Sequence, residues 1–172
     1  YPDQLKIAKV IPIFKNKGDY LLVSNYRPIS LLSNINKIFE KIVYSRLYSF
    51  LNLHNCIYEL QFGFRANHSA NHALISLTEK IRESLDSNNF TCGVFIDLQK
   101  AFDTVNHDIL LHKLNHYGVR GVANNWFRSY LSNRQQFVYI NGFQSSYKTM
   151  HYGVPQGSVL GPRLFLIYIN DL

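Results

Sequence analysis

Residues 91–103 read TCGVFIDLQKAFD, an apolar run that ends in a carboxylate at Asp97. The β-branched and aromatic residues before Asp97 predict a buried strand over residues 91–97. A carboxylate at the end of such a strand is costly to desolvate unless a cation or a hydrogen-bond donor meets it. Magnesium suits the position, because it takes hard oxygen ligands and binds carboxylates together with substrate phosphates. The alternatives are a solvated strand end and a helix cap supplied by Asp97 or Asp103.

A glycine- and proline-rich stretch, GVPQGSVLGP at residues 153–162, is the second candidate site. Its glycines allow the backbone to approach a ligand closely, and the amide side chain of Gln156 can position a base or a sugar. The helix expected behind it would add free N–H groups for a phosphate. An ordinary junction between a loop and a helix fits the same residues. Ser158 is not expected to be a hydrolase nucleophile, because the GxSxG pattern needs glycines where Gln156 and Leu160 stand.

The rest of the chain predicts an α+β fold in which helices pack on a small antiparallel sheet. We expect a strand over residues 5–14 that is broken by Pro12, and a hairpin that turns at Asn141-Gly142 and returns to about Met150. The predicted helices begin near residue 34, span residues 69–86, lie near residues 105–116 and 122–131, and follow the loop at 153–158. No internal repeat or linker divides the chain, so one unit is expected.

Apolar residues at helical spacing define one face of each of the first two helices. On the first, with Asn34 as its expected cap, these residues are Ile35, Ile38, Phe39, Ile42, Val43, Leu47, Phe50 and Leu51. On the second, the residues expected to point inward are Ala70, Ala73, Leu74, Leu77, Ile81 and Leu85.

The net charge of +7 is unevenly distributed along the chain. Residues 1–50 hold eight basic and three acidic residues, residues 51–96 hold three and four, and residues 97–172 hold seven and four. A basic surplus at both ends of the chain suits two basic walls that face a polyanion. A basic soluble protein without such a partner is the alternative.

Cys56 and Cys92 are far apart and form no CxxC pair, which argues against a disulfide framework or a thiolate zinc site and fits an intracellular compartment. No apolar run approaches the roughly 20 residues that span a bilayer, so no membrane partner is expected. The chain lacks an initiator Met and ends in the apolar stretch LFLIYI, residues 164–169, and both ends are therefore interpreted as truncations.

Two histidine pairs, His68 with His72 and His112 with His116, have the i,i+4 spacing that a zinc site on a helix uses. Neither pair contains the glutamate of the HExxH pattern. We expect these histidines to lie near the surface without a metal.

Four stretches together resemble the reverse transcriptases of non-LTR (LINE-type) retrotransposons. They are NYRPISLLSNINKIFEKIVYSRL (25–47) and QFGFR (61–65), similar to the fingers motifs, FIDLQKAFDTVNH (95–107), similar to motif A, and GVPQGSVLGPRLFLIYINDL (153–172), similar to motif B and the helix after it. The resemblance implies a right-hand polymerase fold, with fingers over residues 1–90 and a partial palm over residues 91–172. Motif C, an aromatic-x-Asp-Asp hairpin, is absent, and Asp171 does not replace it.

The resemblance assigns the metals to motif A. Asp97 matches the catalytic aspartate that binds both metal ions, and the backbone carbonyl of Leu98 matches a further metal contact. Phe102 matches the aromatic gate beneath the incoming sugar, where a flat ring leaves no room for a 2′-hydroxyl. Packing in the core is the alternative for Phe102, and the two roles are compatible.

The resemblance also assigns the nucleotide contacts. Gln156 and Gly157 match the motif B pair at the incoming nucleotide. Lys15 and Arg27 match the fingers cations that hold the triphosphate, with Lys17 as a competitor of Lys15 because the loop alignment can slip by two residues. Arg65 is expected to meet the template or to brace the fingers.

The function implied is RNA-templated DNA synthesis with two Mg²⁺ ions, in which the partners are an RNA template, a DNA primer and deoxynucleoside triphosphates. No protein partner is evident, and the family implies cytoplasm and nucleus as its locations. The chain by itself is expected to be inactive, because it lacks the second carboxylate motif. The alternatives are an inactive nucleic-acid-binding remnant and a group II intron-type maturase. The polymerase interpretation requires Asp97 to face a cleft beside the Gln156 turn.

Overall fold

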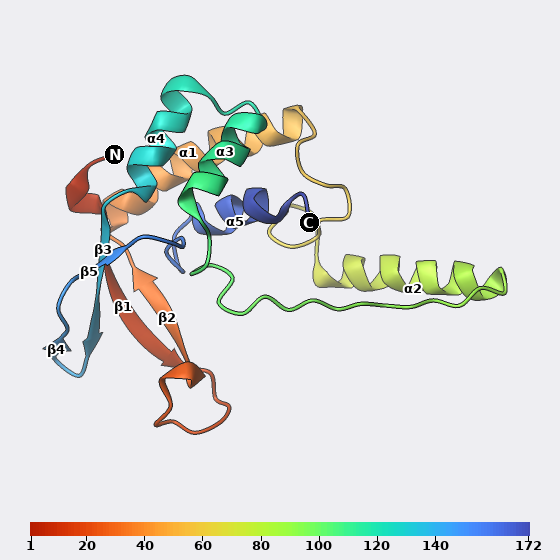
Figure 1. Cartoon of the computed structure of the whole chain (residues 1–172), viewed down its shortest axis with the longest axis horizontal. Helices are drawn as coiled ribbons and strands as arrows, with labels where there is room; N and C mark the ends of the chain where they lie inside the picture. Colours follow the sequence, from red (N-terminus) through yellow and green to blue (C-terminus); the bar gives the residue numbers. More distant parts are fainter.

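The computed structural model describes residues 1–172, in which four helices pack together beside a small sheet and one helix projects away from them (Figure 1). The helices are α1 (Asn34–Leu53), α2 (Ala70–Asp86), α3 (His107–His116), α4 (Gly121–Leu131) and α5 (Gly161–Ile169). The strands are β1 (Ile7–Phe14), β2 (Tyr26–Leu31), β3 (Arg134–Ile140), β4 (Phe143–Gln144) and β5 (Lys148–Met150). The α+β class is therefore confirmed, and each predicted helix lies within a few residues of its expected position.

The sheet is mixed rather than antiparallel, which corrects the prediction. Its order is β2-β1-β3-β4, and β5 also pairs with β3. The pairs β1·β2, β3·β4 and β3·β5 are antiparallel, but β1 and β3 run parallel from Ile7↔Gln135 to Val10↔Val138. A parallel pair needs a long crossover, and here the chain from β2 to α4 supplies it.

Pro12 does not break β1, and the prediction missed β2 altogether. Pro12 lies directly opposite Pro28 in the antiparallel ladder, beyond the end of the parallel pairing with β3 at Val10. Neither proline has an N–H group to donate, so they can share a pair position that requires no hydrogen bond. Residues 26–31 read YRPISL, and a proline within so short a stretch argues against a strand, so the sequence pattern concealed β2.

The predicted turn at Asn141-Gly142 is confirmed. Asn141 has a φ of 48° and Gly142 a φ of 87°, so both central residues are left-handed, as a type I′ hairpin turn requires. The return side ends at Met150 as predicted, but it is interrupted, because residues 145–147 separate β4 from β5.

The hydrophobic core lies among α1, α3, α4, α5 and their connections. Its 16 buried members are Leu47, Leu51, Ile57, Val105, Leu110, Leu111, Leu114, Val119, Phe127, Tyr130, Leu131, Val154, Leu160, Leu164, Phe165 and Ile167. No helix of the structure combines the length and the apolar character that a membrane crossing demands.

The apolar face predicted for α1 is buried only in its second half. Leu47 and Leu51 are in the core, but Ile35, Ile38, Phe39 and Ile42 are 43–59% exposed. The first half buries two polar residues instead, Asn36 and Glu40, both at 0% exposure. Ser33, not Asn34, caps the helix, and its hydroxyl accepts a bond from the amide N–H of Asn36 at 3.2 Å.

The inward face predicted for α2 and the strand predicted at residues 91–97 are both wrong for this structure. α2 has no buried residue, and residues 89–98 have no strand hydrogen bonds and return from the far end of α2 toward the rest of the molecule (Figure 1). Val94, Phe95 and Ile96 are 82–85% exposed. A strand requires a partner for its ladder, and the five-stranded sheet offers none to this segment.

Two leucine substitutions test this division of the chain. Leu114→Ala should lower the free energy of unfolding by about 2–5 kcal/mol, because Leu114 is fully buried in the core that α3 shares with α4 and α5. Leu74→Ala on α2 should change it by less than about 0.5 kcal/mol, because Leu74 is 60% exposed. Urea denaturation of the chain measures both, and equal losses would contradict the exposed position of α2.

Candidate functional site

The turn at residues 153–158 meets residues 102–107 through backbone hydrogen bonds. The amide of Gly153 donates to the carbonyl of Val105 at 2.7 Å, and that of Val154 donates to the carbonyl of Phe102 at 2.8 Å. Nε2 of His107 lies 2.7 Å from the carbonyl oxygen of Gly153. The two stretches that sequence analysis singled out are therefore joined, although they are about 50 residues apart in sequence.

Glycine is required at position 153 for this contact. Its φ is +85°, and an added Cβ would lie 2.9 Å from the Cα and carbonyl oxygen of Asp103 and from the carbonyl oxygen of Phe102. All three obstacles are backbone atoms, which cannot move aside as a flexible side chain can.

The other side of the turn lies against β2. The amide of Ser30 donates to the carbonyl of Gln156 at 2.7 Å. Gly157 has a φ of +115°, and a Cβ there would lie 2.8 Å from the carbonyl oxygen of Ser30. The backbone of Gln156 is thus fixed, while its half-buried side chain forms no hydrogen bond within the protein and remains available to a ligand.

Phe102 forms an aromatic surface near this turn. Its ring centroid lies 5.1 Å from that of Phe165 in α5 and 6.1 Å from that of Phe64. Phe102 is half-buried, so it packs against the core and still presents part of its ring to solvent. The contact with Phe64 brings the stretch at residues 61–65 to the same place.

Asp103 follows Phe102 and carries the one perturbed carboxyl of this stretch. Partial burial raises the pKa of the Asp103 carboxyl, and the nearby positive charge of Lys100 partly offsets this effect. The sequence offered Asp103 only as a helix cap, but Asn106 has that role in α3 and accepts from the amides of Asp108 and Ile109.

Asp97 has no hydrogen bond or ion pair to the Gln156 turn, beside which it was expected. It is exposed on the extended segment, no ion pair involves it, and the hydrogen bonds of the turn go to other residues. Leu98, also expected at the metal, is 48% exposed. No group of three or more His, Cys, Asp or Glu side chains lies close enough together to hold a metal ion, so this chain by itself forms no cage of protein ligands around one.

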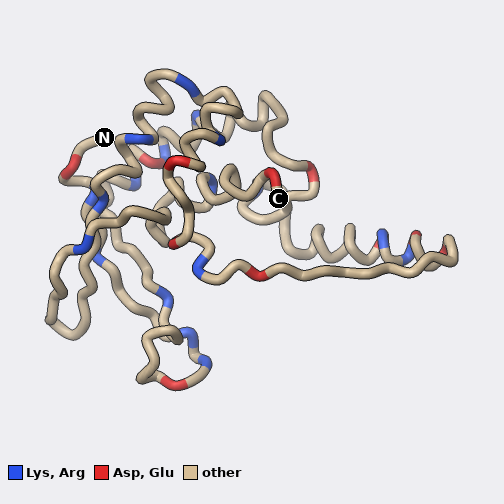
Figure 2. Tube along the Cα trace, viewed as in Figure 1, with Lys and Arg blue, Asp and Glu red and all other residues tan.

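Lys15 and Arg27, the expected triphosphate cations, lie on the β1–β2 hairpin, where basic residues gather around the connecting loop (Figure 2). Arg27 pairs with Ile13, and the amide of Lys15 donates to the carbonyl of Asn25 at 2.8 Å, which continues the ladder. Residues two apart on a strand share a face, so Lys15 and Arg27 are diagonal neighbours on one face. Nζ of Lys15 donates to the carbonyl of Ser24 at 2.8 Å.

Lys17 and Arg65 have different surroundings. Lys17 is exposed in the bend of the connecting loop and lies beyond the ladder, so it lacks the fixed relation to Arg27 that Lys15 has. Arg65 braces its own loop, because Nη1 donates to the carbonyls of Tyr58 and Glu59 at 3.2 and 3.1 Å.

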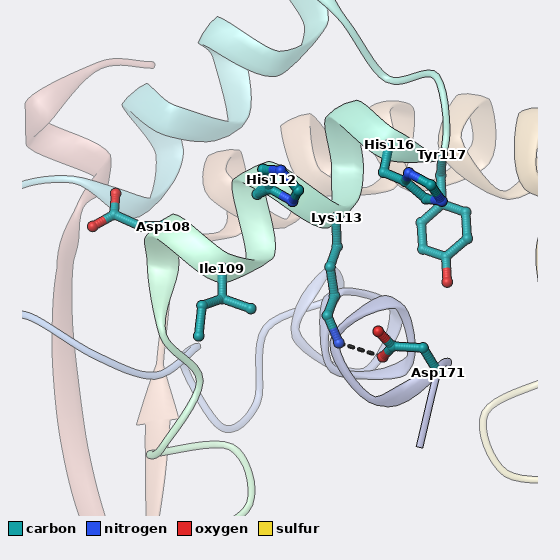
Figure 3. Close-up of a pocket in the computed structure, with 7 residues that line it drawn as sticks. All are labelled: Asp108, Ile109, His112, Lys113, His116, Tyr117 and Asp171. Carbon is teal, nitrogen blue, oxygen red and sulfur yellow. Dashed lines mark hydrogen bonds and ion pairs between the residues drawn. The ribbon is translucent and has the colours of Figure 1, made fainter.

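A separate hollow of about 460 Å³ lies over α3 and the end of the chain (Figure 3). It is lined by Asp108, Ile109, His112, Lys113, His116, Tyr117 and Asp171. Lys113 forms an ion pair with Asp171, and this bond lowers the pKa of the Asp171 carboxyl. None of the residues predicted for the site lines this hollow.

The sequence reasoning missed Ser30, His107 and Glu40, all of which contact the turn at 153–158 or the residues just after it. Each lies inside or at the end of a stretch that carried the resemblance, and this was the only signal available for them. Glu40 in particular sits in an apolar helix pattern, which gives no indication that its carboxylate is buried.

Gly153→Ala tests the close approach at the turn, with Gly142→Ala as the matched control. Both glycines have positive φ, but a Cβ at Gly142 would meet nothing within 4 Å. Gly142→Ala should therefore lower the unfolding free energy by about 1–2 kcal/mol from backbone strain alone. Gly153→Ala should lower it by at least about 2 kcal/mol more, because the clash with Asp103 adds to the strain. Similar losses for the two variants in a denaturation experiment would contradict the contact.

The sequence of this chain matches a known protein family and several individual proteins. The family model described as "Reverse transcriptase (RNA-dependent DNA polymerase)" matches residues 13–172. The chain is 36% identical over its whole length to the probable RNA-directed DNA polymerase from transposon BS of Drosophila melanogaster, and 34% identical to the RNA-directed DNA polymerase from the mobile element jockey of the same fly. It is also 29% identical, over 90% of its length, to the Pol polyprotein of the type-1 retrotransposable element R2 of Popillia japonica.

The chain spans 19% of the length of each of the two fly proteins and 21% of the R2 protein. The family match nevertheless includes all four of the stretches that carried the resemblance, and it extends from β1 to the last residue. The chain therefore belongs to the reverse transcriptase (RNA-dependent DNA polymerase) family, which confirms the resemblance to the enzymes of non-LTR retrotransposons.

Proposed function

We propose that the protein containing this chain synthesises DNA on an RNA template, and that the Gln156 turn receives the incoming deoxynucleoside triphosphate. One observation carries the proposal: three of the four family stretches meet at one place. Backbone bonds join the turn to Ser30 on one side and to residues 102–105 on the other. A ligand at the turn would contact residues from all three stretches.

The exposed groups around the turn suit a nucleotide. The free amide of Gln156 can donate and accept hydrogen bonds with a base or a sugar. The ring of Phe102 would lie under the sugar and exclude a 2′-hydroxyl by its bulk. Lys15 and Arg27 share one face of the β1–β2 hairpin, where two cations can offset the charge of a triphosphate.

Magnesium has no defined place in this proposal. The family assignment suggests two Mg²⁺ ions at Asp97 and the carbonyl of Leu98, but these residues are exposed and belong to no cluster of three or more metal-binding side chains. We therefore assign no step of the reaction to a metal on this chain. The RNA template and DNA primer are proposed as partners from the family, with Arg65 near the template.

Primer extension by the full-length protein tests the nucleotide site. Gln156→Ala should reduce kcat/KM for deoxynucleotides roughly 10-fold, the value of one good hydrogen bond, and leave the affinity for primer–template unchanged. Gln4→Ala, an exposed change outside the site, is the control. Absence of any template-dependent extension by the native protein would contradict the proposed function. Unchanged kinetics in Gln156→Ala would contradict the role of Gln156.

Competition between ribonucleotides and deoxynucleotides tests the role of Phe102. Phe102→Val should raise relative ribonucleotide incorporation by about 10- to 100-fold, because it opens space for the 2′-hydroxyl. Phe64→Val is the matched control, because it removes an aromatic ring that packs edge-on against Phe102 and leaves the Phe102 ring itself present. Equal discrimination in all three proteins would leave Phe102 as a packing residue only.

A further inference from the structure

Glu40 is a fully buried carboxylate in the first half of α1. The apolar residues around it in sequence, Phe39 and Ile42, are 43% and 52% exposed, so the helix turns its polar residue inward. Burying a carboxylate without compensation is strongly unfavourable. Hydrogen-bond donors must therefore surround the carboxylate, and their identity shows which part of the protein Glu40 binds.

Four donors meet the two carboxylate oxygens of Glu40. Oε1 accepts from Nδ2 of Asn36 at 2.8 Å and from the hydroxyl of Tyr130 at 2.9 Å. Oε2 accepts from the backbone amides of Val159 and Leu160 at 2.5 and 3.2 Å. Burial and the charge of Glu40 raise the pKa of Tyr130 well above its usual value, which keeps the phenol protonated as a donor.

The two amides lie immediately before α5, and the side chain of the N-cap residue Leu160 makes no capping bond. The amide of Gly161 is satisfied by the hydroxyl of Ser158 at 2.9 Å, and Pro162 has no N–H group. The amides of Val159 and Leu160 would otherwise be left without partners. Glu40 thus acts as the cap of α5 from another helix, at the end of α5 where a negative charge is stabilising.

Glu40 and Ser30 hold the turn from its two sides. Ser30 binds the carbonyl of Gln156, and Glu40 binds the amide of Val159, three residues further along. Both come from one continuous piece of chain, because α1 starts shortly after β2 ends at Leu31. A shift of Gln156 relative to β2 would therefore require the carboxylate to release the amides.

We propose that Glu40 is a positioning residue for the incoming nucleotide, and that its buried carboxylate fixes the position of the Gln156 turn relative to β2. The proposal rests on the proposed function, because it takes Gln156 as a nucleotide contact. The charge is essential to the effect, since bonds to an ionised acceptor are roughly twice as strong as neutral ones.

Glu40→Gln in the full-length protein tests this role, with Glu79→Gln, the same change at an exposed position of α2, as the matched control. The amides of Val159 and Leu160 should exchange with deuterium at least about 10-fold faster in Glu40→Gln, because a neutral acceptor binds them more weakly. The KM for deoxynucleotides should rise about 10-fold, with the affinity for primer–template unchanged. The control should match the native protein in all three measurements.

The outcomes separate this proposal from the proposed function. Native exchange rates at both amides, or a loss of primer–template affinity equal to the rise in KM, would overturn the positioning role. A native protein without polymerase activity would overturn the proposed function, and the exchange rates would still decide whether Glu40 holds the turn. If Glu40→Gln does not fold, Glu40→Asp keeps the charge but retracts it by one methylene, and the same faster exchange and higher KM are expected.

Discussion

The contact between the backbone of Gly153 and the backbone of residues 102–103 is the constraint on which the site depends. It leaves no room for a Cβ, and it brings together two stretches that α3, α4 and the β3–β5 hairpin separate in sequence. Once this contact forms, Phe102 and Gln156 are held near each other by main-chain bonds. Gly157 repeats the arrangement on the opposite side against Ser30. The turn is thus defined by backbone approach, and the side chain of Gln156 remains free for a ligand.

Local features of the fold could be predicted from the sequence because their causes are local. Asn141-Gly142 forms its turn through the φ angles of two residues, and the ends of α2 follow from Ser69 and from the apolar spacing of one segment. The sequence gives no comparable signal for β2, because Pro28 hides its pattern and its partner β1 decides its conformation. The parallel pairing of β1 with β3 likewise depends on two segments more than 120 residues apart.

The candidate site was predictable to a similar extent. The residues of the turn and Phe102 follow from the family stretches, and their meeting is observed. Asp97 has the expected identity, but its strand requires a hydrogen-bonding partner that the sheet does not supply, so its apolar neighbours remain exposed. The sequence motif therefore identifies Asp97 but does not establish that its segment forms a strand. Glu40 shows the opposite case. Periodicity assigned the inward face of α1 to apolar residues, but Glu40 is buried there because Tyr130 and the amide of Val159 donate hydrogen bonds to it.

Burial also changes where the positive charge of the protein is available. Sequence counts suggested two basic walls, but Arg134 and Arg163 are at 0% and 1% exposure and lie against the rings of Tyr130 and Tyr48, at 4.8 and 4.6 Å from the ring centroids. Without them, residues 97–172 keep five basic residues against four acidic ones, and Lys113 is paired with Asp171.

The basic surplus of residues 1–50 changes little when buried residues are left out of the count. Burial of Lys6 and Glu40 leaves seven basic residues against two acidic ones, and several of the seven lie on the β1–β2 hairpin and its loop. The attraction for a polyanion is therefore concentrated on the side of Lys15 and Arg27. Arg134 and Arg163 contact tyrosine rings rather than solvent, so a charge count from sequence overstates the second wall.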